Sequence, residues 1–222
     1  TPDLGADEFS PPSCTDAVGG TASGSTSFCG SGTPAITASG YSTGIGSGYQ
    51  WYSSTNISDY PNAGTAVSGQ TNPATLTTGA VSVTTYFWLR VTCTSGIATD
   101  NSTMVTITIN PIPTASASSN TPVCSGNTLN LTGSTDIGTS YSWTGPNSFS
   151  SSSQSPSITN VTTAATGTYT FTATLNGCTS APATTSVVIN PTPTALSITP
   201  ASANICIGAI QQLTASGGNT PV

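Results

Sequence analysis

The six cysteines are the residues of this 222-residue chain whose spacing most clearly predicts chemistry, namely disulfide formation. The order cysteine, tryptophan, cysteine occurs twice, first as Cys29, Trp51 and Cys93 and again as Cys124, Trp143 and Cys178. In some two-sheet β-sandwiches a buried tryptophan packs beside a bridge that joins the sheets, and this order is its sequence signature. We therefore predict the disulfides Cys29–Cys93 and Cys124–Cys178. Cys14 and Cys206 are left unpaired or bonded to another chain.

Few other side chains suit catalysis or metal binding. The chain has no His, and Arg90 is its only Lys or Arg. This inventory excludes Ser-His-Asp and Cys-His catalysis, Schiff-base lysines and imidazole metal sites. Three isolated acids stand in turn-like contexts, where solvated carboxylates are more expected than a glycosidase pair; they are Asp59, Asp100 and Asp136. Calcium would best suit the N-terminal acids Asp3, Asp7 and Glu8. We predict no catalytic residue, no metal site and no cofactor.

The charge balance limits the partners. The formal net charge is −6, and charged residues make up only 4% of the chain. One cation cannot neutralise a run of phosphates, so nucleic-acid binding is excluded. No apolar run approaches the length of a membrane span, so no membrane insertion is expected. Ser and Thr number 79. A surface made of hydroxyls and amides favours an extracellular, secreted protein over a cytosolic one.

Internal repeats organise the chain. An aliphatic residue followed by Thr lies seven residues after each of Cys29, Cys124 and Cys206, and Asn-Pro-x-Pro occurs at 110–113 and at 190–193. These markers predict four segments. They are an acidic tail at 1–19, a first repeat at 20–113, a second repeat at 114–193, and the first strands of an incomplete third repeat at 194–222.

Each complete repeat is expected to be a β-sandwich, because short β-branched and aromatic runs alternate with Gly, Pro, Asn and Ser. In the second repeat we expect strands near 113–118, 127–132, 139–144, 156–161, 167–175 and 181–190. In the fifth of these, Tyr169, Phe171, Ala173 and Leu175 alternate with threonines and should face inward. Proline stiffens the linkers. The predicted fold class is therefore all-β, with tandem immunoglobulin-like β-sandwiches in a rod-like array and essentially no helix.

One face of the first repeat is a candidate binding surface. If Phe87 and Leu89 face the core, strand alternation turns Trp88 and Arg90 outward. The same reasoning applied to Trp51 turns Gln50 and Tyr52 outward on a neighbouring strand. The predicted binding face, which consists of Gln50, Tyr52, Trp88 and Arg90, could stack on a sugar or contact a protein. A structural cross-strand pair is the alternative.

Four runs of the second repeat carry a resemblance to a known type of domain. They are Cys-Ser-Gly-Asn-Thr-Leu-Asn-Leu-Thr-Gly at 124–133, Tyr-Ser-Trp-Thr-Gly-Pro at 141–146, Gly-Thr-Tyr-Thr-Phe-Thr-Ala-Thr-Leu-Asn-Gly-Cys-Thr-Ser at 167–180 and Val-Val-Ile-Asn-Pro-Thr-Pro at 187–193. Together with their counterparts over about 20–222, they resemble the tandem immunoglobulin-like (PKD-like) repeats of giant secreted surface proteins of Bacteroidota. Gliding-motility adhesins and other cargo of the type IX secretion pathway carry such repeats. The resemblance implies a cell-surface stalk or adhesin without catalysis.

The sequence thus predicts a non-catalytic extracellular structural or adhesion segment of a repetitive bacterial surface protein. Its partners would be neighbouring domains, copies of the same protein or surface glycans. One alternative is a subunit of an extracellular filament, in which residues 194–222 donate strands to a neighbour and Cys206 bridges to another chain's Cys14. A second alternative is a carbohydrate-binding module that uses the predicted binding face. We expect 194–222 to be either a truncated repeat or a donated strand pair.

Overall fold

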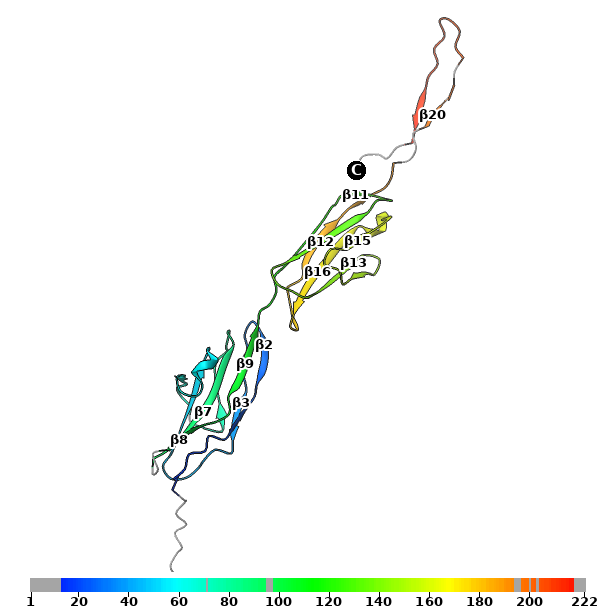
Figure 1. Ribbon diagram of the computed structural model, residues 1–222. Helices are drawn as coiled ribbons and strands as arrows, with labels where there is room; N and C mark the ends of the chain where they lie inside the picture. Colours follow the sequence, from blue (N-terminus) through cyan, green and yellow to red (C-terminus); the bar gives the residue numbers. More distant parts are fainter. Residues whose placement is uncertain are drawn as a thin grey trace, which may run out of the picture. The chain divides into compact units, whose positions relative to one another are not determined.

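The structure is a computed structural model that describes residues 13–70, 72–94, 98–193, 197–199, 201–202 and 204–217. The acids Asp3, Asp7 and Glu8, considered above for calcium, lie outside the described residues. The chain divides into two compact units, Thr1–Ile112 (unit 1) and Pro113–Val222 (unit 2). Figure 1 shows that both are built of strands.

Unit 1 is a sandwich of two sheets. The first sheet has the order β1 (Thr21–Ser23), β3 (Ile36–Ser39), β6 (Thr75–Leu76). The second has the order β2 (Thr26–Cys29), β9 (Val105–Asn110), β7 (Thr85–Cys93), β4 (Ser47–Ser54), β5 (Thr65–Ala66), and β8 (Ala98–Asn101) also pairs with β7. A single-turn 3-10 helix, η1 (Ile57–Asp59), follows β4.

Unit 2 repeats this plan. Its first sheet has the order β10 (Ala115–Ser119), β12 (Leu129–Thr135), β15 (Ser157–Ile158). Its second has the order β14 (Phe149–Ser151), β13 (Ser140–Gly145), β16 (Gly167–Leu175), β17 (Cys178–Thr179), with β18 (Ala183–Val187) also paired with β16. The strands β11 (Val123–Cys124) and β19 (Ile189–Asn190) form a separate pair, and η2 (Thr163–Ala165) is a short 3-10 helix.

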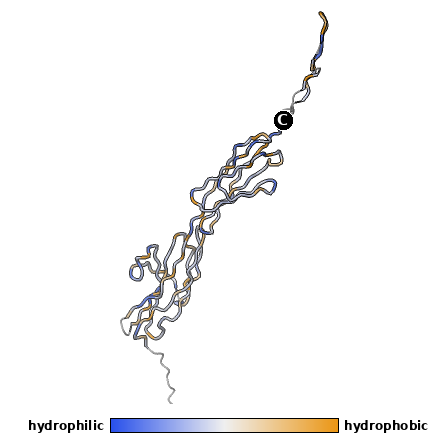
Figure 2. Tube along the Cα trace, turned by 45° about the vertical axis from the view of Figure 1, so that its right-hand side comes forward, coloured by the Kyte–Doolittle hydropathy of each residue, from blue (hydrophilic) through white to orange (hydrophobic). Residues whose placement is uncertain are grey.

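Alternating side chains build each core. In β16, Tyr169, Phe171 and Ala173 are buried, as the alternation predicts, and the threonines between them face away from the core. Leu175, at the end of the strand, is only half-buried. Trp51 and Trp143 occupy the centres of the two cores and are almost wholly buried. Figure 2 shows hydrophobic and hydrophilic residues interspersed along both units. The prediction of an all-β chain with almost no helix is confirmed for the described residues, whose helices are η1 and η2.

In both units, an early strand runs parallel to the last strand. β2 pairs in parallel with β9, and β11 pairs in parallel with β19, while all other strand pairs of the described residues are antiparallel. In unit 1 the chain crosses from the first sheet to the second between β1 and β2. Gly24 makes this crossing with a φ of +119°, and a Cβ there would lie 2.3 Å from the Ala35 carbonyl oxygen. Only glycine fits this position.

The strands β20 (Ser197–Thr199) and β21 (Thr214–Ser216) pair with each other and with no other described strand. Their register aligns Ile198 with Ala215, as that of β1 and β3 aligns Ala22 with Ala38. These strands therefore pair as β1 and β3 do in unit 1, like the opening strands of the first sheet of a third sandwich. Ile198 of β20 is more than half exposed, and so are four aliphatic side chains between the two strands, namely Ile205, Ile207, Ile210 and Leu213.

Candidate functional site

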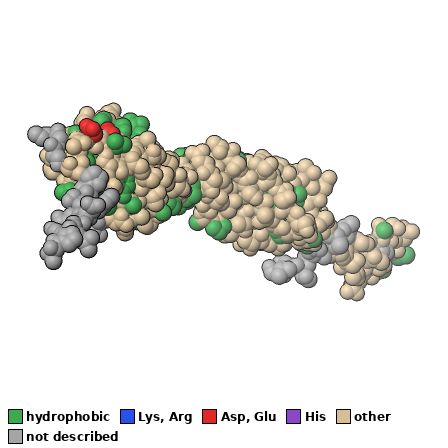
Figure 3. All heavy atoms as spheres, turned by 90° about the horizontal axis from the view of Figure 1, so that it is seen from below, with side chains coloured by type: hydrophobic (Ala, Val, Ile, Leu, Met, Phe, Trp, Pro, Cys, Tyr) green, Lys and Arg blue, Asp and Glu red, His purple; other side chains and the backbone are tan. Residues whose placement is uncertain are grey.

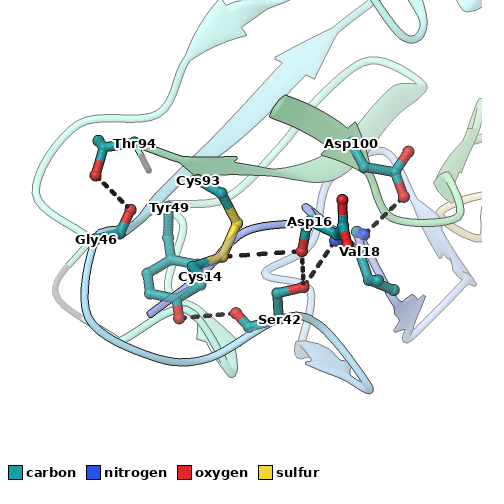
Figure 4. Close-up of a disulfide and its surroundings, with 10 residues drawn as sticks. Cys14, Asp16, Val18, Ser42, Gly46, Tyr49, Cys93, Thr94 and Asp100 are labelled. Carbon is teal, nitrogen blue, oxygen red and sulfur yellow. Dashed lines mark hydrogen bonds between the residues drawn. A yellow bond between two sulfur atoms is a disulfide. The ribbon is translucent and has the colours of Figure 1, made fainter. Parts of the chain in front are cut away.

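A buried disulfide joins Cys14 to Cys93 at one end of unit 1 (Figure 4). Their Cα atoms lie 5.2 Å apart, and the two residues are 5% and 0% exposed. Cys14 belongs to the segment that leads into β1, and Cys93 is the last residue of β7. The bond therefore ties the incoming chain to the central strand of the sandwich.

Hydrogen bonds hold the same incoming segment. The N–H of Cys14 donates to the carbonyl oxygen of Ile45 at 3.0 Å. The hydroxyl of Ser42 accepts the N–H of Val18 at 2.8 Å and donates to the carbonyl oxygen of Asp16 at 2.9 Å. The carboxylate of Asp100 accepts the N–H of Gly19 at 2.8 Å. Figure 4 shows Asp16, Val18, Ser42 and Asp100 around this segment. The segment 13–19 is thus an integral part of unit 1 and not a free tail.

The predicted bond Cys29–Cys93 is wrong, because the two residues lie at opposite ends of the sheet. Thr85 of β7 pairs with Ile107 of β9, and Cys29 pairs with Asn110 of β9. Cys29 therefore lies three residues beyond the start of β7, and Cys93 lies eight residues from that start in the other direction. At about 3.3 Å per residue, they are on the order of 35 Å apart. The prediction that Cys14 has no partner within the chain is also wrong, because Cys14 and not Cys29 is bonded to Cys93.

The predicted bond Cys124–Cys178 fails in the same way. Cys124 pairs with Asn190 at one end of unit 2, while Cys178 pairs with Leu175 in the β16–β17 hairpin at the other end. The free, exposed thiols are those of Cys124 and Cys206. Cys29 and Cys178 are disulfide-bonded and are not free.

The predicted binding face is assembled but closed. Strand alternation predicted that the four residues share one face, and the cross-strand register places Gln50 opposite Arg90 and Tyr52 opposite Trp88. Tyr52 stacks on Trp88 with ring centroids 5.9 Å apart, and the guanidinium of Arg90 lies 4.6 Å from the Tyr52 ring centroid. Trp88 is nevertheless 0% exposed, so its predicted exposure is wrong.

Residues 55–64 cover this face. The ring of Tyr60 meets Trp88 edge-on at 5.6 Å, and a Cβ on Gly64 would lie 2.3 Å from the Trp88 ring. Arg90 holds the segment in place, since its Nη2 donates to the Pro61 carbonyl oxygen at 2.6 Å. Unit 1 therefore has a second small apolar layer outside its sheet. The sequence signal for it was the longer interval between Trp51 and Cys93 than between Trp143 and Cys178.

The three acids of the repeats serve separate local roles. The carboxylate of Asp59 accepts a hydrogen bond from the hydroxyl of Ser54, and that of Asp100 accepts one from the N–H of Gly19. Asp136 accepts the N–H groups of Thr114 and Ile137 at 2.8 and 2.7 Å. The Thr114 bond is the main reason why the pKa of Asp136 lies below its ordinary value of 3.8. Within the described ranges, no three His, Cys, Asp or Glu side chains gather where a metal ion could bind.

The surface is poor in charge. The face drawn in Figure 3 consists mostly of uncharged polar side chains and backbone, with one small acidic patch and scattered hydrophobic groups. In the part of the chain that the structure describes, no helix has the length and apolar character needed to cross a membrane.

Comparisons with known proteins give one family model and several solved structures. Residues 18–111 match the family model described as "Domain of unknown function (DUF8696)". No curated protein matches the sequence. Among solved structures, the N-terminal four Ig domains of Dscam1 isoform 1.9 share 14% identity at a TM-score of 0.37, over 74% of this chain and 43% of that one. This chain thus spans less than half of the Dscam1 chain.

Two further structures have similar values. The amphioxus IgVJ-C2 molecule shares 15% identity at a TM-score of 0.39, over 73% of this chain and 99% of that one. A chain from the complex of the mouse coronavirus receptor-binding domain with its murine receptor shares 13% identity at a TM-score of 0.46, over 73% and 95%. The two-sheet strand order of each unit is that of an immunoglobulin-like sandwich.

Proposed function

We propose that the chain is a non-catalytic, extracellular structural segment of a bacterial surface protein, and that its units resist tension applied along the polypeptide. The observation that carries this proposal is the parallel pairing of an early strand with the last strand in both units. The resemblance of the repeats to Bacteroidota surface proteins supports the location, as do the disulfide Cys14–Cys93 and the hydroxyl-rich composition.

The parallel pair loads its hydrogen bonds in shear. Tension on the two ends of unit 2 pulls β11 and β19 in opposite directions along their common axis. The bonds between them, among them Val123 N–H to Val188 O at 3.1 Å and Ser125 N–H to Asn190 O at 2.8 Å, must then break together. Antiparallel end strands would let such bonds open one at a time. A fold with parallel end strands therefore suits a part that holds a surface structure away from the cell.

Ser125→Pro tests this proposal. Cys124 O accepts the N–H of Asn127 at 3.1 Å, and Gly126 has a φ of +89°. These features define a type II turn with Ser125 at its second position, where proline is favoured. The substitution thus removes one N–H from the pair and leaves the turn intact. We expect a lower unfolding force for unit 2 in single-molecule pulling from the chain ends. Ser125→Ala, which keeps the N–H, should match the unaltered chain, and equal forces in all three would contradict the proposal.

A filament subunit is the second candidate function. The observation that favours it is the set of exposed aliphatic side chains at Ile198 and within 204–213, which a neighbouring copy would cover. Residues 137–222 contain no Asp, Glu, Lys or Arg, so charge repulsion between copies there is small. Sedimentation velocity distinguishes the two candidates, since a filament subunit should form larger species as concentration rises. Leu213→Asp should then restore the monomer, with Ser118→Asp, an exposed site in unit 2, as its control.

The carbohydrate-binding alternative loses its structural basis. It required an exposed aromatic platform, and Trp88 is buried under residues 55–64. Glycans as partners therefore have no identified site in the described residues.

A further inference from the structure

Cys124 has an exposed free thiol at one end of unit 2. We call this the trailing end, because β19 ends there and the chain continues into Pro191, Thr192 and Pro193. Cys124 pairs with Asn190, and the next residue, Ser125, donates its N–H to the Asn190 carbonyl oxygen. The thiol is thus fixed beside the point where the chain leaves the unit.

The same position in unit 1 is occupied by Cys29. Cys29 pairs with Asn110, the last residue of β9, in the register that Cys124 has with Asn190. Gly30 then donates its N–H to the Asn110 carbonyl oxygen at 2.9 Å, as Ser125 does to Asn190. Cys29 is disulfide-bonded, whereas Cys124 is free. Equivalent positions of the two units therefore hold a disulfide-bonded cysteine in unit 1 and a free thiol in unit 2.

Each unit also has a cysteine at its other, leading end, where its first strand begins. In unit 1 this is Cys93, and its partner Cys14 lies in the chain that leads into the unit. In unit 2 it is Cys178. The β16–β17 hairpin places Cys178 opposite Leu175, near the turn after β12, where Asp136 holds the incoming Thr114. Both leading-end cysteines are disulfide-bonded, and in unit 1 the partner, Cys14, comes from the chain that precedes the first strand.

We infer that Cys124 forms a disulfide with the leading-end cysteine of a further immunoglobulin-like domain that follows unit 2. The two thiols lose two protons and two electrons as their S–S bond forms. The acceptor is a disulfide oxidant such as oxidised glutathione, which is reduced to two thiols. This bond would staple consecutive domains across their linker. It adds a covalent element to the proposed tension-resisting function but does not depend on it.

Cys206 is not the expected partner of Cys124. Cys206 stands seven residues before Leu213, as Cys124 stands seven before Leu131 and Cys29 seven before Ile36. It therefore occupies the trailing-end position of the third repeat. A bond between two trailing-end cysteines would not follow the pattern shown by Cys14 and Cys93.

An extended chain tests the inference. Residues 1–193 are followed directly by a second copy of 114–193, so that a complete domain with its own Cys178 follows unit 2. The Asn-Pro-x-Pro linker then precedes Thr114 at both junctions, as it does in the original chain. The protein is folded in a glutathione redox buffer and alkylated with iodoacetamide without reduction. Intact mass then gives the number of free thiols.

One free thiol is expected, that of Cys124 in the second copy. Cys124→Ser in the second copy should lower the count to zero, while Cys124→Ser in the first copy should raise it to two. The same substitution thus lowers the number of free thiols in one copy and raises it in the other. Three free thiols in the extended chain, with two after Cys124→Ser in the second copy, would overturn the inference. Neither result depends on the unfolding force, so this test and that of the proposed function can fail separately.

Discussion

The hydroxyl of Ser102 accepts the backbone N–H of Leu89 at 2.9 Å and so takes the place of a carbonyl oxygen in the strand ladder. The N–H of Ser102 donates to the Leu89 carbonyl oxygen at 2.8 Å, and Ser102 is fully buried. Ser180 makes the same pair of bonds with Ala173 in unit 2, at 3.1 and 2.9 Å. Both units thus use a buried serine to complete the backbone hydrogen bonds of a central strand. In β7 this happens between its pairing with β8 and with β9, and in β16 between its pairing with β17 and with β18.

Ser102→Ala should destabilise unit 1 by about 1–3 kcal/mol, because it leaves the Leu89 N–H buried without an acceptor. Urea denaturation of the oxidised chain measures the change. Ser27→Ala, at an exposed position of β2, is the matched control and should change stability by less than about 0.5 kcal/mol. Equal effects of the two substitutions would show that the buried hydroxyl does not support the ladder.

Trp88→Ala should destabilise unit 1 by about 3–5 kcal/mol, as expected for a buried tryptophan. This expectation replaces the exposed position that the sequence predicted. The loss comes from the layer formed with Tyr52 and Tyr60. Thermal unfolding measures it, with Trp143→Ala in the core of unit 2 as the reference of similar size. An unchanged melting temperature for Trp88→Ala would mean that residues 55–64 do not cover the sheet.

Trypsin should cut the oxidised chain very slowly. Arg90 provides its only cleavage site, lies within β7, and is held by Pro61 and by the side chain of Asn101. Cleavage therefore requires β7 to open. Gel electrophoresis follows the reaction, and the two fragments should separate only after reduction, because the bond Cys14–Cys93 spans the site. Rapid cutting of the folded, oxidised chain would contradict the burial of this strand.

Unit 2 should lose stability at acidic pH through Asp136. Its pKa is lowered in the folded state, first by the hydrogen bond from Thr114. A lowered folded-state pKa stabilises the fold above the unfolded-state value of about 4 and loses this contribution as pH falls through the folded value. The melting temperature of unit 2 should therefore fall as the pH drops below about 4, and by less in Asp136→Asn. Parallel pH profiles for the two proteins would rule out this role.

Strand alternation made much of the fold predictable. The pattern at 167–175 predicted the bounds of β16 and its buried face, and the same alternation placed Gln50, Tyr52, Trp88 and Arg90 on one face of two neighbouring strands. Side-chain direction in a strand has a period of two, so it can be read directly from sequence. Short strands such as β11, β14 and β17 escaped prediction, because two or three residues carry too little pattern.

Such patterns could not predict the disulfide pairing or the burial of Trp88. Spacing along the chain shows that Cys29 and Cys93 belong to one sandwich, but it does not show which end of a strand each occupies. The covering of Trp88 depends on contacts made by Tyr60 and Arg90 from outside the sheet. Both features are set by tertiary packing.

The layer that covers Trp88 also determines which backbone hydrogen bonds of unit 1 open last. β7 has apolar neighbours on both faces, with Leu89 directed into the core and Trp88 into the outer layer. In β16 of unit 2, the corresponding outer face is a row of threonines that water can reach. Local fluctuations that admit deuterium to the edges of each sandwich should leave the centre of β7 untouched. Its amide hydrogens would then exchange last, and their rate would report the complete unfolding of unit 1.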